Sequence, residues 1–181
     1  QILTKTDDNI GLMFLEEDME KTAKGIMSLA VNKPLHLPDT VYTPEEYKEA
    51  FEYTMGTGRI YLFDHFGSSG IDNIVSRVRY LARGCGCGFV LLDHISIVVS
   101  NQENGDERKA LDEIMTKLRT VVQETGIGLI CVSHLKRPEG KGHEEGAATS
   151  LAQLRGSGSI AQLSDIVIGL ERNGQANDPI E

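Results

Sequence analysis

An unbroken apolar run that ends in a carboxylate lies near the middle of the chain. Residues 88–92 read Gly-Phe-Val-Leu-Leu, and Asp93 and His94 follow directly. Such a run predicts a β-strand buried on both faces, as in a parallel sheet. A carboxylate at the carboxyl end of that strand lies in the crevice where open α/β sheets bind ligands. The alternative is that Asp93 only caps the turn that follows.

Similar apolar runs recur along the chain, at residues 9–15, 59–64, 127–133 and 165–171. The segments between them show helical spacing of apolar residues. Helices are predicted from Met19, after the capping box at Thr43, from Ile71 to Leu81, over 111–122, and over 151–163 with a glycine interruption. Alternating strands and helices predict an α/β fold whose parallel sheet is covered by helices on both faces.

Length, composition and charge limit the possible classes of protein. A chain of 181 residues with 40% hydrophobic content can bury one core, so we expect a single domain over 1–181. The net charge of −9 argues against a generally basic nucleic-acid binder, but it leaves room for a basic loop. Three cysteines form neither a disulfide framework nor a complete zinc set, which favours a reduced, intracellular compartment. The sequence shows no signal peptide and no apolar stretch of membrane-spanning length.

Three of the predicted strands end in polar side chains, namely Glu16, Asp93 and His134. In a parallel sheet these three ends lie on one edge. A carboxylate such as Asp93 can hold magnesium through water, and one such as Glu16 can deprotonate an attacking water. A polar group such as His134 can contact the oxygens of a transferred phosphoryl group.

Each of these residues also has a purely structural interpretation. His134 can be satisfied by backbone groups, and Glu16 can stabilise a helix N-terminus. Glu17 is adjacent, so chemistry alone does not distinguish the two glutamates. His94 and Asp64 are interpreted as structural.

Several longer segments resemble the helicase domain of the phage primase–helicase family, which is related to the DnaB replicative helicases and the mitochondrial Twinkle helicase. The similarity is dense from residue 88 to 173 and weakest over 31–58. The segments that carry it are Leu-Leu-Asp-His-Ile-Ser-Ile-Val-Val-Ser (91–100), Asp-Glu-Arg-Lys (106–109), Met-Thr-Lys-Leu (115–118), Ser-His-Leu-Lys (133–136), His-Glu-Glu-Gly (143–146), Leu-Arg-Gly-Ser-Gly (154–158), Gln-Leu-Ser-Asp (162–165), Leu-Glu-Arg-Asn (170–173) and Gly-Leu-Met-Phe-Leu-Glu-Glu (11–17).

The resemblance implies a RecA-like (P-loop NTPase) motor that uses ATP or another NTP with Mg²⁺. It implies a ring of six subunits that translocates on single-stranded DNA and unwinds duplex DNA. It also implies a primase domain or primase partner, and a cytoplasmic location in a bacterial or phage-infected cell. By position, Glu16 matches the catalytic glutamate, Asp93 matches the Walker B aspartate, and His134 matches the residue that contacts the γ-phosphate.

Two further groups of residues are assigned by the same resemblance. Arg155 and Gln162 match a segment that links the nucleotide state to neighbouring elements. The residues that match the DNA-binding loop of the central channel are Lys136, Arg137, Lys141 and Gly142. A cluster of basic residues suits phosphate contacts, although the same composition is typical of a solvated flexible loop.

The phosphate-binding motif Gly-x-x-x-x-Gly-Lys-Ser/Thr does not occur in residues 1–181. By resemblance, we expect the chain to begin after the Walker A strand and loop and to stop before the trans-acting arginine. We therefore expect an incomplete sheet, no significant ATPase activity in the isolated chain, and self-association through an open sheet edge.

Two other functions remain open at this point. A RecA-type recombinase shares the fold, and a degenerate binding or assembly module would not hydrolyse nucleotide at all. The segments Leu-Arg-Gly-Ser-Gly and Ser-His-Leu-Lys favour the helicase over the recombinase.

Overall fold

A parallel four-stranded sheet forms the centre of the computed structural model, which describes residues 2–64, 70–99, 107–135, 142, 148–154 and 158–171. The strands are β1 (Asn9–Phe14), β2 (Ile60–Leu62), β3 (Cys87–Asp93) and β4 (Gly128–Cys131), in the order β2-β1-β3-β4. In the register, Phe14 lies opposite Asp93 and Leu92 lies opposite Cys131. The predicted α/β fold with a parallel sheet is confirmed.

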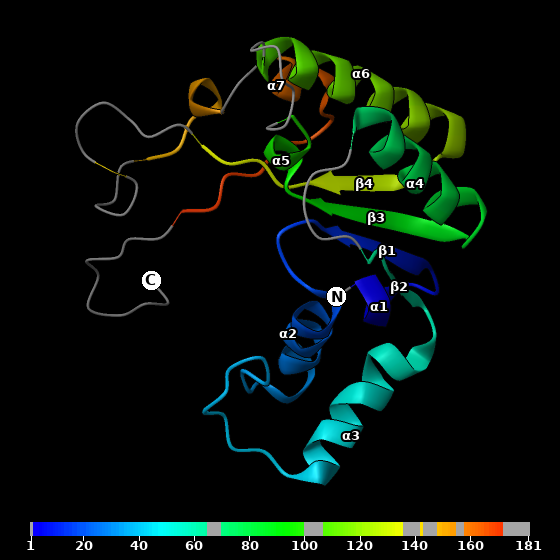
Figure 1. Ribbon diagram of the computed structural model, residues 1–181, viewed down its shortest axis with the longest axis vertical. Coiled ribbons are helices and arrows are strands. Elements are labelled where there is room, and N and C mark those ends of the chain that lie inside the picture. The colour runs from blue at the N-terminus through cyan, green and yellow to red at the C-terminus, as the bar shows by residue number, and fades with distance from the viewer. Residues whose placement is uncertain are drawn as a thin grey trace.

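Helices precede, connect and follow the strands (Figure 1). They are α1 (Ile2–Lys5), α2 (Met19–Val31), α3 (Pro44–Tyr53), α4 (Ile71–Arg83), α5 (Ile95–Val99), α6 (Glu107–Thr125) and α7 (Ser159–Leu163), with short 3₁₀ turns at Met55–Thr57 and Leu151–Gln153. No helix in this described part of the chain is long and apolar enough to cross a membrane.

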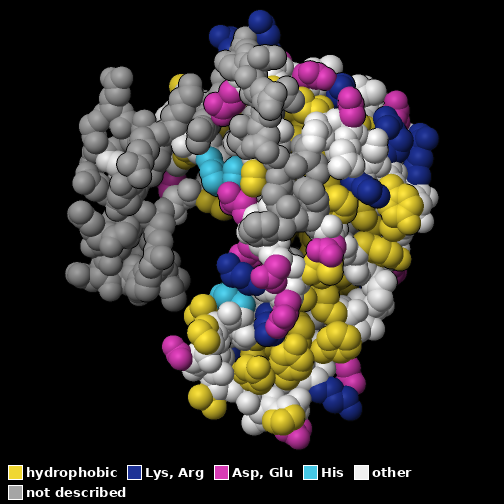
Figure 2. Space-filling view, in the orientation of Figure 1, with side chains coloured by type: hydrophobic (Ala, Val, Ile, Leu, Met, Phe, Trp, Pro, Cys, Tyr) yellow, Lys and Arg dark blue, Asp and Glu magenta, His cyan; other side chains and the backbone are white. Residues whose placement is uncertain are grey.

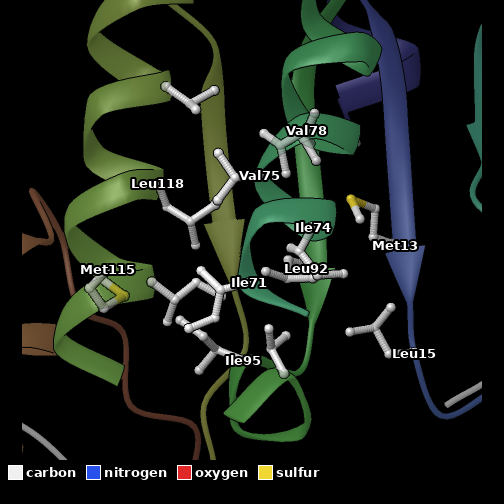
Figure 3. Packing of buried hydrophobic residues seen from close by; sticks show 14 of the residues in the cluster. Met13, Leu15, Ile71, Ile74, Val75, Val78, Leu92, Ile95, Met115 and Leu118 are labelled. Atoms are coloured by element: carbon white, nitrogen blue, oxygen red, sulfur yellow. The ribbon is translucent and has the colours of Figure 1, made fainter. Parts of the chain in front are cut away.

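The main core lies between one face of the sheet and helices α4, α5 and α6 (Figure 3). Alternate residues of a strand point to the same face, so Val90 and Leu92 of β3 and Met13 of β1 all meet this layer of helices. The apolar side chains that helical spacing predicts to face inward on α4 are buried: Ile71, Ile74, Val75, Val78 and Leu81. On α6, five of the six predicted are buried and the sixth, Val122, packs against the core while partly exposed; the five are Leu111, Ile114, Met115, Leu118 and Val121.

The boundaries of the helices follow local sequence signals. Gly126 follows α6 in a left-handed conformation (φ 74°), which glycine adopts without steric cost. At the start of α3, the Thr43 side chain accepts a hydrogen bond from the Glu46 amide, and the Glu46 carboxylate accepts one from the Thr43 amide. The predicted capping box is therefore confirmed.

Helices α2 and α3 lie on the other side of β1 and β2 in Figure 1 and form a second, smaller apolar cluster around Met27, Leu35 and Ala50. Hydrophobic side chains remain visible on the surface of this lower part of the molecule in Figure 2. Phe51 is 47% exposed, and Met19 and Ala30 are also exposed, so the predicted inward faces of α2 and α3 are partly wrong. A small two-helix cluster does not bury a complete face of either helix.

The second face of the sheet is covered unevenly. Leu12 of β1 is buried, but Ile130 of β4 is 45% exposed. The expected covering of both faces therefore holds for the first face, and only in part for the second.

One predicted strand is wrong. Residues 165–171 follow α7 without forming a strand, and Ile166, Ile168 and Leu170 are 80%, 77% and 89% exposed. A β-strand needs a neighbour for its backbone N–H and C=O groups, and this segment pairs with none of the described strands. The predicted helix over 151–163 is likewise reduced to a 3₁₀ turn and the short helix α7.

Candidate functional site

The carboxyl ends of β1 and β3 are joined by backbone contacts, which brings the two predicted acidic residues together. The Leu15 amide donates to the Asp93 carbonyl at 2.7 Å, one residue before Glu16. Because the two strands run in parallel, the residues that follow them leave the sheet on the same edge. This edge is the position that the sequence predicted for a ligand site.

The end of β4 is connected to the same place. The Val132 amide donates to the Leu92 carbonyl at 2.9 Å, and the Ile95 amide donates to the Val132 carbonyl at 3.0 Å. His134 follows two residues later, and its ring centroid lies 4.0 Å from that of His94, with 32° between the ring planes. The predicted convergence of Glu16, Asp93 and His134 therefore holds in the structure.

His94 lies at the centre of this group, although the sequence interpretation left it as structural. It is only 6% exposed, and its Nε2 atom is 3.0 Å from the Oε1 atom of Glu16. The signal that would have found it is its position directly after Asp93 at the end of the same buried run. Figure 2 shows histidine and acidic side chains side by side near the strand ends on the left of Figure 1.

Burial raises the pKa of the Asp93 carboxyl above its usual range, and the nearby carboxylate of Glu16 raises it further. The imidazoles of His94 and His134 act in the opposite direction. A half-buried carboxylate whose negative charge is poorly compensated by the protein is a good ligand for a cation. This environment fits the Mg²⁺ expected beside Asp93, with Glu16 as a second oxygen donor.

A transition-metal site is the other possibility that the geometry offers. One ligand atom from each of Glu16, His94 and His134 lies within 4.8 Å of the others. Imidazole lone pairs lie in the ring plane, and the two rings are stacked, so their lone pairs do not converge on one point. The cluster fits a hydrogen-bonded acid–base group better than a closed metal site.

The remaining predicted residues lie outside this cluster or outside the described part of the chain. Gln162 is exposed on α7, which packs against the core through Ile160. Gly142 is described and half-buried, without assigned secondary structure. The predicted residues that lie outside the described ranges are Lys136, Arg137, Lys141 and Arg155.

A parallel α/β sheet with carboxylates and histidine at one edge defines a nucleotide-hydrolase type of domain. Residues 8–180 match the family described as "DnaB-like helicase C terminal domain", so the chain belongs to that family. This result confirms the resemblance and places the chain in the helicase ATPase domain.

Individual relatives agree with this assignment. The chain is 42% identical over 175 residues to the "DNA helicase/primase" of Enterobacteria phage T3, covering 94% of this chain and 31% of that protein. It is 26% identical over 176 residues to the "Replicative DNA helicase DnaC" of Bacillus subtilis, covering 95% of this chain and 38% of that protein. The chain thus spans between about a third and two fifths of the length of these relatives.

Solved structures support the fold. A structure described as an isolated ATPase domain superposes with a TM-score of 0.68 at 20% identity, over 88% of this chain and 57% of that one. A structure described as a DnaB-like replicative helicase and its interactions with primase gives a TM-score of 0.69 at 19% identity, over 88% and 40% of the two chains. The predicted RecA-like architecture is confirmed at this level.

Proposed function

We propose that this chain is part of the motor domain of a hexameric replicative DNA helicase, which couples NTP hydrolysis to translocation on single-stranded DNA and unwinding of duplex DNA. The observation that carries the proposal is the meeting of Glu16, Asp93 and His134 at one sheet edge in a member of a helicase family. We further propose that the motor acts in the cytoplasm of a bacterial or phage-infected cell, in line with its phage relative.

Glu16 is the proposed general base. Its side chain is 56% exposed and is held at one oxygen by His94, so the other oxygen is free to accept a proton from water. His134 lies on the other side of the His94 ring, at the distance of a direct ring contact. It is proposed to contact the transferred phosphoryl group.

Asp93 is the proposed magnesium ligand, holding the ion through water. When bound, Mg²⁺ supplies neutralisation of the phosphate charge during hydrolysis. The role of Asp93 is to keep a partly desolvated negative charge at the end of β3, where burial raises its pKa and its ionised form gains most from a cation.

The proposed partners of the motor are single-stranded DNA, further copies of the chain, and a primase. Lys136, Arg137, Lys141 and Gly142 are the proposed DNA loop, because basic residues on an acidic protein bind backbone phosphates in a salt-dependent way. Arg155 and Gln162 are the proposed link from nucleotide state to neighbouring elements. Primase association is proposed because one relative is named a helicase/primase and one structural neighbour is described with primase.

The test uses the full-length protein that carries this chain. We expect NTP- and Mg²⁺-dependent displacement of a strand from a forked duplex, and loss of displacement with retained DNA binding in Glu16→Gln. Strand exchange without strand displacement would point to a recombinase and contradict the proposal. Absence of NTP turnover in the full-length protein would instead indicate a binding or assembly module.

A further inference from the structure

We propose that His94 is a positioning residue that donates its Nε2 hydrogen to Glu16 and so fixes the carboxylate for water activation. This inference rests on the proposed function, because Glu16 is the general base only if the chain is an NTPase motor. It assigns a role to a buried histidine that the sequence pattern alone marks as structural.

The backbone on both sides of His94 is fixed. The Asp93 carbonyl accepts from the Leu15 amide at 2.7 Å, and the Ile95 amide donates to the Val132 carbonyl at 3.0 Å. His94 is therefore held between the ends of β1 and β4, and its own carbonyl accepts from the Ile97 amide at 3.3 Å in the first turn of α5. The imidazole at 6% exposure has little freedom to rotate.

The hydrogen-bond partners of the ring identify the position of its proton. Glu16 Oε1 lies 3.0 Å from Nε2, and a carboxylate can only accept. Nδ1 is buried and has no hydrogen-bond partner among the described residues. A neutral imidazole carries one N–H, so the form protonated at Nε2 makes the hydrogen bond and the opposite tautomer makes none.

The two adjacent glutamates are held in different directions. The Glu17 carboxylate pairs with Lys21 at 2.9 Å on the first turn of α2. The Glu16 carboxylate is instead directed toward the strand ends by His94. His94 thus distinguishes two chemically identical side chains that the sequence alone does not separate.

His94 also joins Glu16 to His134. Its ring edge faces the carboxylate, and its ring face lies 4.0 Å from the His134 ring. A displacement of His134 by bound nucleotide is therefore transmitted to the general base through one rigid, buried side chain. Loss of the Nε2 donor leaves Glu16 free to sample other rotamers, and misplacement of a catalytic group by about 1 Å can cost about 100-fold in rate.

Two substitutions separate the donor from the ring. His94→Phe keeps an aromatic ring and removes the donor, whereas His94→Gln removes the ring and can place an amide N–H near the position of Nε2. We expect kcat for NTP hydrolysis by the full-length protein to fall about 10- to 100-fold in His94→Phe, with KM within about twofold of wild type. His94→Gln should recover at least half of the lost activity on a logarithmic scale, and the exposed reference His36→Gln should match wild type.

A direct measurement does not depend on activity or on stable variants. Nitrogen-15 NMR of histidine-labelled wild-type protein should show His94 as a neutral ring protonated at Nε2. Protonation at Nδ1, or equal kcat in His94→Phe and wild type, would overturn the role of His94. If Glu16→Gln retains full turnover, the proposed role of Glu16 fails instead, while the NMR result still decides whether the hydrogen bond exists.

Discussion

The carboxylate of Glu16 lies 3.0 Å from the imidazole Nε2 of His94, although 78 positions separate the two residues in the sequence. The contact follows from the sheet, because the parallel register of β1 and β3 places Phe14 opposite Asp93. The residues that leave the two strand ends then meet in the same place. Chemistry at this edge therefore depends on sheet register as much as on the identity of the side chains.

The first prediction separates Glu16 from Glu17. Glu16→Gln should lower the NTPase kcat of the full-length protein by about 100- to 10,000-fold, the usual contribution of a general base. Glu17→Gln removes only an exposed ion pair with Lys21 at 2.9 Å, so its kcat should stay within about threefold of wild type. Steady-state phosphate release at saturating NTP measures both. Equal losses in the two variants would contradict the assignment of Glu16.

The second prediction concerns Asp93 and the pH dependence of stability. Burial raises the folded-state pKa of Asp93 above the unfolded value of about 3.9, so its ionisation opposes folding as pH rises through the folded pKa. Asp93→Asn should therefore unfold at a higher temperature than wild type at pH 7, and the difference should shrink toward pH 4. Thermal unfolding without Mg²⁺ across this pH range measures the effect.

Asp165→Asn is the matched control for Asp93, because the sign of its effect is opposite. Arg119 donates to Asp165 at 2.5 Å and lowers the pKa of that carboxyl, so its ionised form contributes stability above the unfolded pKa and loses it as pH falls. The Asp165 variant should be slightly less stable than wild type at pH 7. Parallel behaviour of the two variants would show that burial does not dominate at Asp93.

The third prediction tests the core between α6 and the sheet. Leu118 is 1% exposed, and Leu118→Ala should lower the free energy of unfolding by about 2 to 5 kcal/mol. Leu29 on α2 is 84% exposed, and the same substitution there should change stability by no more than about 0.5 kcal/mol. Urea unfolding followed by circular dichroism compares the two. A loss below about 1 kcal/mol at Leu118 would mean that the contact with the sheet is not formed.

The sequence predicted the parts of the fold that local patterns control. Apolar runs identified β1 and β3, and helical spacing identified the buried faces of α4 and α6, because a single layer of contacts buries each of these elements. The convergence of Glu16, Asp93 and His134 was also predictable, since parallel strands place their ends on one edge. Family motifs supplied the expected roles of these residues.

The parts that depend on a spatial neighbour were not predictable. The role of His94 required knowledge of which side chain lies opposite the end of β3. The predicted strand over 165–171 failed because an apolar, β-branched pattern states only that a segment can be a strand. Whether it forms one depends on a partner, and the described residues provide no strand beside it.

The last prediction follows from that unpaired segment. In the polypeptide of residues 1–181, Ile168 is 77% exposed within the apolar run after α7, and Ile130 on β4 is 45% exposed at the end of the strand order β2-β1-β3-β4. Exposed apolar surface and an edge strand favour association between copies. We expect concentration-dependent association in sedimentation velocity and a clear decrease in Ile168→Lys, because a charge opposes pairing there. Val41→Lys, at a site 87% exposed before α3, should associate like wild type. A strictly monomeric wild type, or equal decreases in the two variants, would contradict this prediction.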